Sequence, residues 1–110
     1  MTVNITTHPE FDRQMKRYAK KYRSLASDFA DFLKSIRENP FQGTDLGGGI
    51  RKVRLAVASK GKGKSGGMRV ITFSLDQFDD DIIDITLLYI YDKKEMENIS
   101  DDFIRYLLEQ

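Results

Sequence analysis

Apolar residues in the N-terminal third of the chain recur with two helical periods. The first set recurs at i, i+4, i+7 and i+11 and consists of Phe11, Met15, Tyr18 and Tyr22. The second set repeats this spacing and consists of Leu25, Phe29, Phe32, Leu33 and Ile36. The capping-box pattern Thr7-x-x-Glu10 predicts the start of the first helix, and Ser24 the start of the second. Because a residue before proline is pushed out of the helical region, the second helix should end before Asn39-Pro40. The pattern therefore predicts a helical hairpin, preceded by a short β-prone run from Val3 to Thr6.

The rest of the chain alternates as strands do. The run from Lys52 to Val57 places apolar side chains on one face and cations on the other. Met68 to Leu75 and Ile82 to Tyr91 are β-branched and aromatic runs joined by an acidic turn, Asp76 to Asp81, and they should form an antiparallel hairpin. The glycine-rich stretch from Phe41 to Gly49 lacks periodicity and is predicted to be a loop.

Ser100 is placed to cap a last short helix, whose apolar side holds Phe103, Ile104, Leu107 and Leu108. The predicted order is β-α-α-β-β-β-α. We therefore expect an α+β fold in which an N-terminal strand and a helical hairpin pack on a small, mainly antiparallel twisted sheet, with a short C-terminal helix. A chain of 110 residues suits one domain, residues 1–110.

Composition narrows the classes of function. Cysteine is absent, which excludes disulfides, thiolate metal sites and cysteine nucleophiles and fits a reducing compartment. We find neither a signal-peptide pattern at the N-terminus nor an apolar run near the ~20 residues that a spanning helix needs. The expected location is the cytoplasm, with no membrane partner.

Charge is segregated along the chain. Its net charge is only +1, yet residues 50–69 hold seven basic residues and no acidic one. Lys52 and Arg54 share one strand face, Lys60, Lys62 and Lys64 follow in a loop, and Arg69 begins the return strand. These cations could converge on one sheet face, an arrangement that suits an RNA backbone.

Two other readings of this block are weaker. Ala58 to Ser65 fits a relaxed phosphate-loop pattern, but such a loop must open a helix, and here a strand sequence follows. A lysine- and glycine-rich tract is also commonly a solvated turn.

His8, the single histidine, sits at a helix start and is expected to cap that helix. We predict neither a metal site nor a cofactor. Tyr89 and Tyr91 share a strand face, where they could stack a base or pack in the core.

Three motifs together resemble the RelE/ParE superfamily of toxins, and most closely its HigB-like branch. They are K-x-R-L from Lys52, S-K-G-K-G-K-S-G-G-x-R-V-I from Ser59, and Y-x-Y-D-K-x-E-x-E-N-I from Tyr89. The resemblance implies a RelE-like fold and a toxin of a type II toxin-antitoxin pair. It also implies cleavage of messenger RNA in the ribosomal A site without a metal, by attack of the 2′-hydroxyl on the adjacent phosphate.

The resemblance also suggests roles for individual residues. Lys52 and Arg54 match two basic strand residues of RelE-type toxins, and Arg69 matches the arginine after the family's glycine turn. Lys94, or its neighbour Lys93, falls where those toxins carry a further arginine. The expected catalytic residues are Lys52, Arg54, Arg69 and Lys94, and the expected RNA-binding residues are Lys60, Lys62, Lys64, Tyr89, Tyr91 and Lys93. Where RelE-type toxins place a catalytic tyrosine, this chain has residues 98–100, Asn-Ile-Ser, so Tyr89 or Tyr91 would have to substitute or the role is vacant.

The implied partners are the ribosome, messenger RNA and a cognate helix-turn-helix antitoxin. Two alternatives stay open. One is a ParE-like, non-enzymatic inhibitor of gyrase, and the other is an RNA-binding module that does not cleave. The convergence of several cations on one strand face favours cleavage over a protein inhibitor, which has no need to hold a phosphate.

Overall fold

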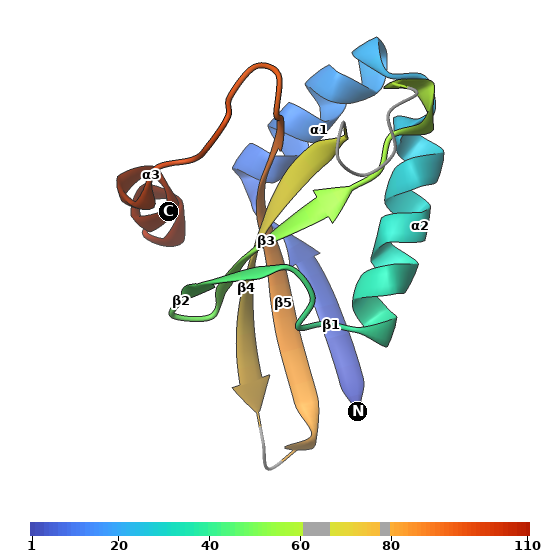
Figure 1. Cartoon of the computed structure of the whole chain (residues 1–110). Coiled ribbons are helices and arrows are strands. Elements are labelled where there is room, and N and C mark those ends of the chain that lie inside the picture. The colour runs from blue at the N-terminus through green and yellow to red at the C-terminus, as the bar shows by residue number, and fades with distance from the viewer. Residues whose placement is uncertain (61–66, 78–79) are drawn as a thin grey trace.

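One mixed sheet organises the protein. In the computed structural model, which describes residues 1–60, 67–77 and 80–110, the strand order is β1-β5-β4-β3-β2 (Figure 1). Strand β1 runs parallel to β5, and the other neighbours are antiparallel. The elements in chain order are β1 (Thr2–Thr7), α1 (Pro9–Lys21), α2 (Leu25–Glu38), β2 (Thr44–Gly47), β3 (Ile50–Leu55), the 3₁₀ turn η1 (Ala58–Lys60), β4 (Met68–Gln77), β5 (Ile82–Asp92) and α3 (Asp101–Leu108). The predicted α+β class, mainly antiparallel sheet and C-terminal helix are confirmed.

The two faces of the sheet carry separate cores. Helices α1 and α2 cover one face, where Phe11, Leu25 and Ile36 pack against strand residues such as Val70 and Ile85. On the other face, α3 places Ile104 and Leu107 against Ile71, Tyr89 and Tyr91. Because α3 is only eight residues long, it covers one part of this second face. Lys52 and Arg54 of β3 lie on the same face as α3.

The helix limits differ from the prediction at one cap. Helix α1 is capped by His8, whose Nδ1 accepts a hydrogen bond from the Glu10 backbone N–H at 3.0 Å. The predicted capping box is wrong because Thr7 is the last residue of β1, where it pairs with Leu87. The role expected of His8 is confirmed, and its Nε2 also lies 3.0 Å from the Leu107 carbonyl oxygen, which links α1 to α3. Ser100 caps α3 as predicted, accepting from the Phe103 N–H.

The glycine-rich segment contains a strand that the sequence pattern did not predict. Thr44 pairs with Lys52 and Asp45 with Arg51, so part of the predicted loop is the edge strand β2. Positive φ angles at Gly47, Gly48 and Gly49 allow the chain to reverse within three residues. The acidic turn is also shorter than predicted, since Asp76 and Gln77 extend β4. Among the described residues, no helix is long and apolar enough to cross a membrane.

Candidate nucleic-acid interface

Register across three strands brings the predicted cations together. Arg54 on β3 lies opposite Arg69 on β4, and Arg69 lies opposite Tyr91 on β5. Two residues along β3, Lys52 lies opposite Ile71, which in turn lies opposite Tyr89. Because directly paired residues point to the same side of a sheet, both rows share the face opposite α1 and α2.

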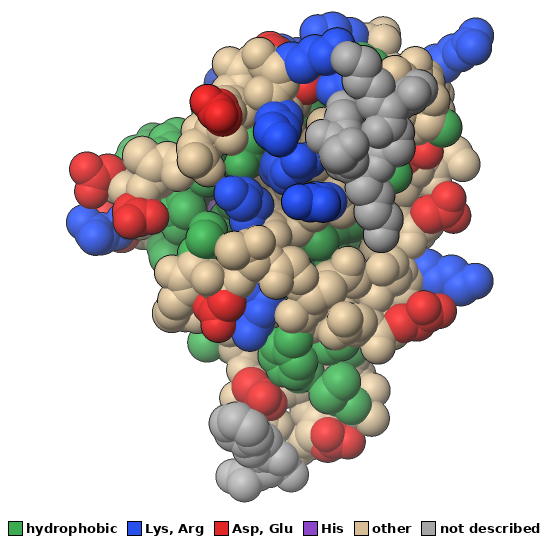
Figure 2. Space-filling model, viewed as in Figure 1, with side chains coloured by type: hydrophobic (Ala, Val, Ile, Leu, Met, Phe, Trp, Pro, Cys, Tyr) green, Lys and Arg blue, Asp and Glu red, His purple; other side chains and the backbone are tan. Residues whose placement is uncertain are grey.

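Arg54 and Lys52 reach the surface of this face. Arg54 is exposed, and its guanidinium makes no hydrogen bond or ion pair with another described residue. Lys52 is half-buried, and its Nζ donates to Asn98 Oδ1 at 3.2 Å, across the segment that leads to α3. Figure 2 shows basic side chains gathered in the middle of this view, with acidic side chains around the margin. We refer to Lys52 and Arg54 as the basic pair.

Arg69 lies beneath the surface beside the basic pair. Only 6% of the residue is exposed, and its Nη1 donates to the Met68 carbonyl oxygen at 3.2 Å. The sequence placed Arg69 among the expected catalytic residues together with Lys52 and Arg54, but in the structure Lys52 and Arg54 reach the surface and Arg69 is buried. Its charge still lies one strand from Arg54, so it can add to the positive field at the surface.

Tyr89 and Tyr91 belong to the second core. They are 8% and 1% exposed, and the Tyr89 ring meets the Phe103 ring edge-on, with centroids 5.0 Å apart. Tyr91 is enclosed, whereas Tyr89 also lines a cavity of about 390 Å³ beside Asn98 and Phe103. Stacking of an RNA base on these rings stays a prediction. The Tyr91 hydroxyl has no hydrogen-bond partner among the described residues. Burial raises the pKa of Tyr91, and the charge of Arg69 opposes that rise.

Lys60 has a structural position rather than an RNA-facing one. Its side chain is 3% exposed, and Nζ lies 2.7 Å from Asp92 Oδ1 in a buried ion pair. Asp92 also accepts hydrogen bonds from the Tyr22 hydroxyl and the Lys94 backbone N–H, and its own N–H donates to the Tyr18 hydroxyl. Burial favours the neutral form of Asp92, but the bonds from Lys60, Tyr22 and Lys94 prevail and lower its pKa to about 2. The expected RNA-binding role of Lys60 is thus replaced by a buried contact.

The remaining predicted residues divide into two groups. Lys93 and Lys94 are exposed just after β5, and the backbone of Lys94 is fixed by Asp92. Lys62 and Lys64 lie outside the described residues. Within residues 1–60, 67–77 and 80–110, no three histidine or acidic side chains come together as a metal site would require.

Asp92 is the residue that sequence reasoning missed at this site. Its signal is present in the run Leu87 to Asp92, where a carboxylate ends a strand that is otherwise apolar or aromatic. A buried carboxylate needs a cation or several donors, and the lysines after β3 are candidates for that cation. The sequence alone could not select Lys60 from the three lysines between β3 and β4.

The comparison with known families agrees with this architecture. A family model described as the RelE toxin of the RelE/RelB toxin-antitoxin system matches residues 11–109, nearly the whole chain. The chain belongs to the RelE toxin family. Membership makes it a toxin of a toxin-antitoxin system and implies an antitoxin as its partner. The matched region includes both helices of the hairpin, the basic pair, Arg69 and α3, so the candidate interface lies inside the family domain.

Proposed function

We propose that this RelE family toxin is a ribosome-dependent endoribonuclease that cleaves messenger RNA in the A site without a metal ion. The observation that carries the proposal is the row formed by Arg54, Arg69 and Tyr91, with Lys52 beside it. Cations from two adjacent strands can act on one phosphate, whereas a surface that only contacts protein has no need of this convergence. The HigB-like motifs of the chain support the same reading.

The cleavage step needs charge stabilisation and two proton transfers. The 2′-oxygen attacks the adjacent phosphorus while its proton passes to a base, and the bond from phosphorus to the 5′-oxygen breaks as that oxygen gains a proton. The products are a 2′,3′-cyclic phosphate and a 5′-hydroxyl. Arg54 and Lys52 are placed to bind the non-bridging phosphate oxygens, with Arg69 adding positive charge from behind. Lys94 lies on the exposed segment after β5 and is a candidate for proton transfer.

The proposed location and partners of the toxin follow from the same proposed activity. The toxin acts in the cytoplasm, where its substrate is messenger RNA on the ribosome, and a helix-turn-helix antitoxin restrains it. An unrestrained nuclease would arrest its own host, so expression of the toxin alone should stop growth.

Mapping of RNA ends after induction tests this proposal. We expect new cuts inside coding sequences, with 3′ ends that block ligation until the cyclic phosphate is removed. Arg54→Ala should reduce the cuts at least tenfold, while Lys34→Ala, which removes an exposed cation from α2 on the opposite side of the sheet, should leave them unchanged. Growth arrest with intact messages and signs of DNA damage would instead support a gyrase inhibitor. RNA binding without cuts or toxicity would support a non-cleaving module.

A further inference from the structure

A polar hollow borders the basic pair at the edge of the sheet. The pairing of β2 with β3 ends at Thr44 and Lys52, so β3 continues past the end of its neighbour. A cavity of about 370 Å³ lies at this point and is lined by Gln42, Gly43, Thr44, Lys52, Val53 and Arg54. Its volume falls in the range of sites for small ligands, about 300–1,000 Å³.

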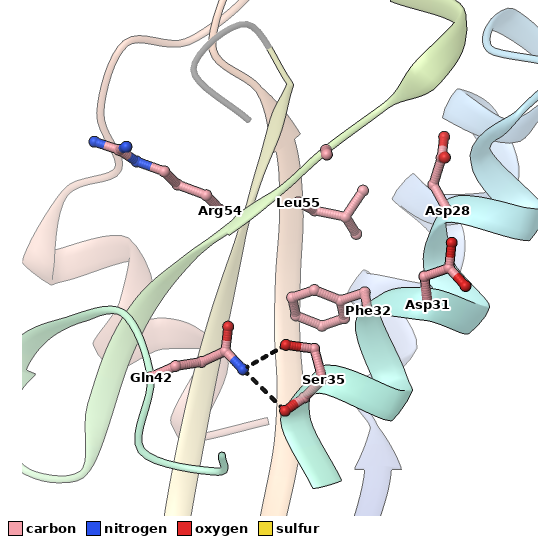
Figure 3. Close-up of a pocket in the computed structure, with 8 residues that line it drawn as sticks. Asp28, Asp31, Phe32, Ser35, Gln42, Arg54 and Leu55 are labelled. Carbon is pink, nitrogen blue, oxygen red and sulfur yellow. Dashed lines mark hydrogen bonds between the residues drawn. The ribbon is translucent and has the colours of Figure 1, made fainter. Parts of the chain in front are cut away.

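The Gln42 side chain in this hollow has a fixed orientation. Its Nε2 lies 3.1 Å from the Ser35 carbonyl oxygen, 2.9 Å from Ser35 Oγ and 3.1 Å from the Asn39 carbonyl oxygen. Carbonyl oxygens can only accept, so these contacts decide which amide atom is nitrogen. Figure 3 shows the nitrogen turned toward Ser35 and the oxygen turned away. Oε1 receives no hydrogen bond from a described residue, so it is a rigid and available acceptor.

The charges around the hollow determine which part of an RNA strand can enter it. Arg54 also borders a second cavity of about 140 Å³ on the α2 side, where Asp28 and Asp31 contribute carboxylates (Figure 3). These carboxylates repel phosphate, whereas the basic pair attracts it. A strand whose phosphate lies on Lys52 and Arg54 is therefore directed to place a neutral base, and not its backbone, beside Gln42.

Gly43 allows the backbone beside this hollow to lie close to β3. Its φ is +98°, and a Cβ at this position would lie 2.5 Å from the Lys52 carbonyl oxygen. The backbone next to Gln42 therefore approaches β3 more closely than any other residue type allows.

We propose that this hollow is a base-reading subsite of the nuclease and that Gln42 is its specificity-determining residue. The inference rests on the proposed function. Gln42 Oε1 accepts a hydrogen bond from an exocyclic amine, which adenine and cytosine carry where guanine and uracil carry a carbonyl oxygen. Two acceptors face each other when a guanine or uracil enters, so cleavage favours adenine over guanine and cytosine over uracil at one fixed position beside the cut.

Sequencing of cleavage ends from induced cells tests the subsite. At that position the unmodified toxin should prefer adenine and cytosine over guanine and uracil about tenfold, relative to their frequency in the same messages. Gln42→Met keeps the length of the side chain but has no amide, and it should reduce this preference to within about twofold of none. Gln42→Ala should give the same result, which guards against a fold defect peculiar to one variant. Thermal unfolding should show both variants folded.

Two control variants separate base reading from structural damage. Ser35→Ala removes one partner of Gln42 but leaves both carbonyl oxygens that orient it, so the preference should persist. Gln77→Met makes the same substitution at the far end of β4 and should also preserve it. An unmodified toxin that cuts without this preference, or a preference that survives both Gln42 variants, overturns the subsite alone. Absence of cuts by the unmodified toxin overturns the proposed function and, with it, the subsite.

Discussion

Two buried polar side chains at the end of β5 differ in how well they are satisfied. Asp92 is fully buried and accepts hydrogen bonds from Lys60, Tyr22 and Lys94. Its neighbour Tyr91 is equally enclosed but has a hydroxyl without a partner among the described residues. A satisfied buried carboxylate stabilises the fold, whereas an unsatisfied hydroxyl costs the free energy of its lost hydration. Substitution of Asp92 should therefore lower the free energy of unfolding, whereas removal of the Tyr91 hydroxyl should raise it.

Asp92 should make stability depend on acid pH. Its folded pKa of about 2 lies below the ordinary 3.8, so its contribution is present above 3.8 and is lost as pH falls to about 2. The difference corresponds to about 2 kcal/mol of unfolding free energy. Chemical denaturation at several acid pH values should show this loss in the unmodified protein.

The variant Asp92→Asn should lack that part of the acid dependence. It also leaves the Lys60 ammonium buried without a counter-charge, so unfolding free energy at neutral pH should fall by about 3 kcal/mol. Asp31→Asn removes the same charge from an exposed position on α2 and should leave both properties nearly unchanged. Equal effects of the two substitutions would contradict a stabilising role for the buried pair.

Removal of the Tyr91 hydroxyl should stabilise the protein. Tyr91→Phe keeps the ring in the second core and removes an unpaired polar atom, so unfolding free energy should rise by about 1 kcal/mol. Tyr89→Phe makes the same change on the same strand face, where the hydroxyl is not among the buried unpaired atoms, and should give no such gain. A loss of stability in Tyr91→Phe, measured by urea denaturation, would show that the hydroxyl has a partner in solution.

At the scale of elements, the periodicity of apolar residues predicted the elements whose positions are determined by burial of an apolar face. These elements are the two helices of the hairpin, the paired strands β4 and β5, and α3. Strand β2 has four exposed residues and no apolar face, so only its pairing with β3 reveals it. Lys52 and Arg54 could be placed on one face by alternation, but the burial of Arg69 and the pairing of Lys60 with Asp92 depend on how strands and helices meet.

The close approach of β3 to the residue before β4 should make Gly67 intolerant of substitution. A Cβ at Gly67 would lie 2.2 Å from the Leu55 carbonyl oxygen, so Gly67→Ala must force the backbones of β3 and β4 apart. The loss of unfolding free energy should be about 3 kcal/mol or more.

A control glycine distinguishes this clash from backbone strain. Gly48 has a φ of +61° but open space around the site of a Cβ, so Gly48→Ala should cost only about 1 kcal/mol. Thermal or urea unfolding of the two variants compares the effects directly. If Gly67→Ala were no worse than Gly48→Ala, the approach of the two strands would be looser than the structure shows.

At the scale of the whole molecule, a net charge of +1 conceals an uneven distribution of charge. Basic side chains occupy the face between β3 and the segment after β5, while acidic residues occupy the β4–β5 end and the first turn of α3. Long-range attraction to a polyanion depends on this local field rather than on the total. RNA binding should therefore weaken with salt even though the protein is nearly neutral.

The salt dependence of binding provides a count of phosphate contacts. The logarithm of the affinity for a single strand falls with the logarithm of salt concentration by about 0.7 for each phosphate neutralised. Arg54→Gln should therefore make this slope less steep by about 0.7, because the exposed Arg54 guanidinium is free to pair with phosphate. Lys34→Gln on α2 should leave the slope unchanged, although it changes the net charge equally. Affinity for an RNA with a 2′-deoxy substitution at the cut, which blocks cleavage, can be measured by fluorescence anisotropy over a range of salt concentrations. Identical slopes for the two variants would mean that RNA responds to net charge and not to the basic pair.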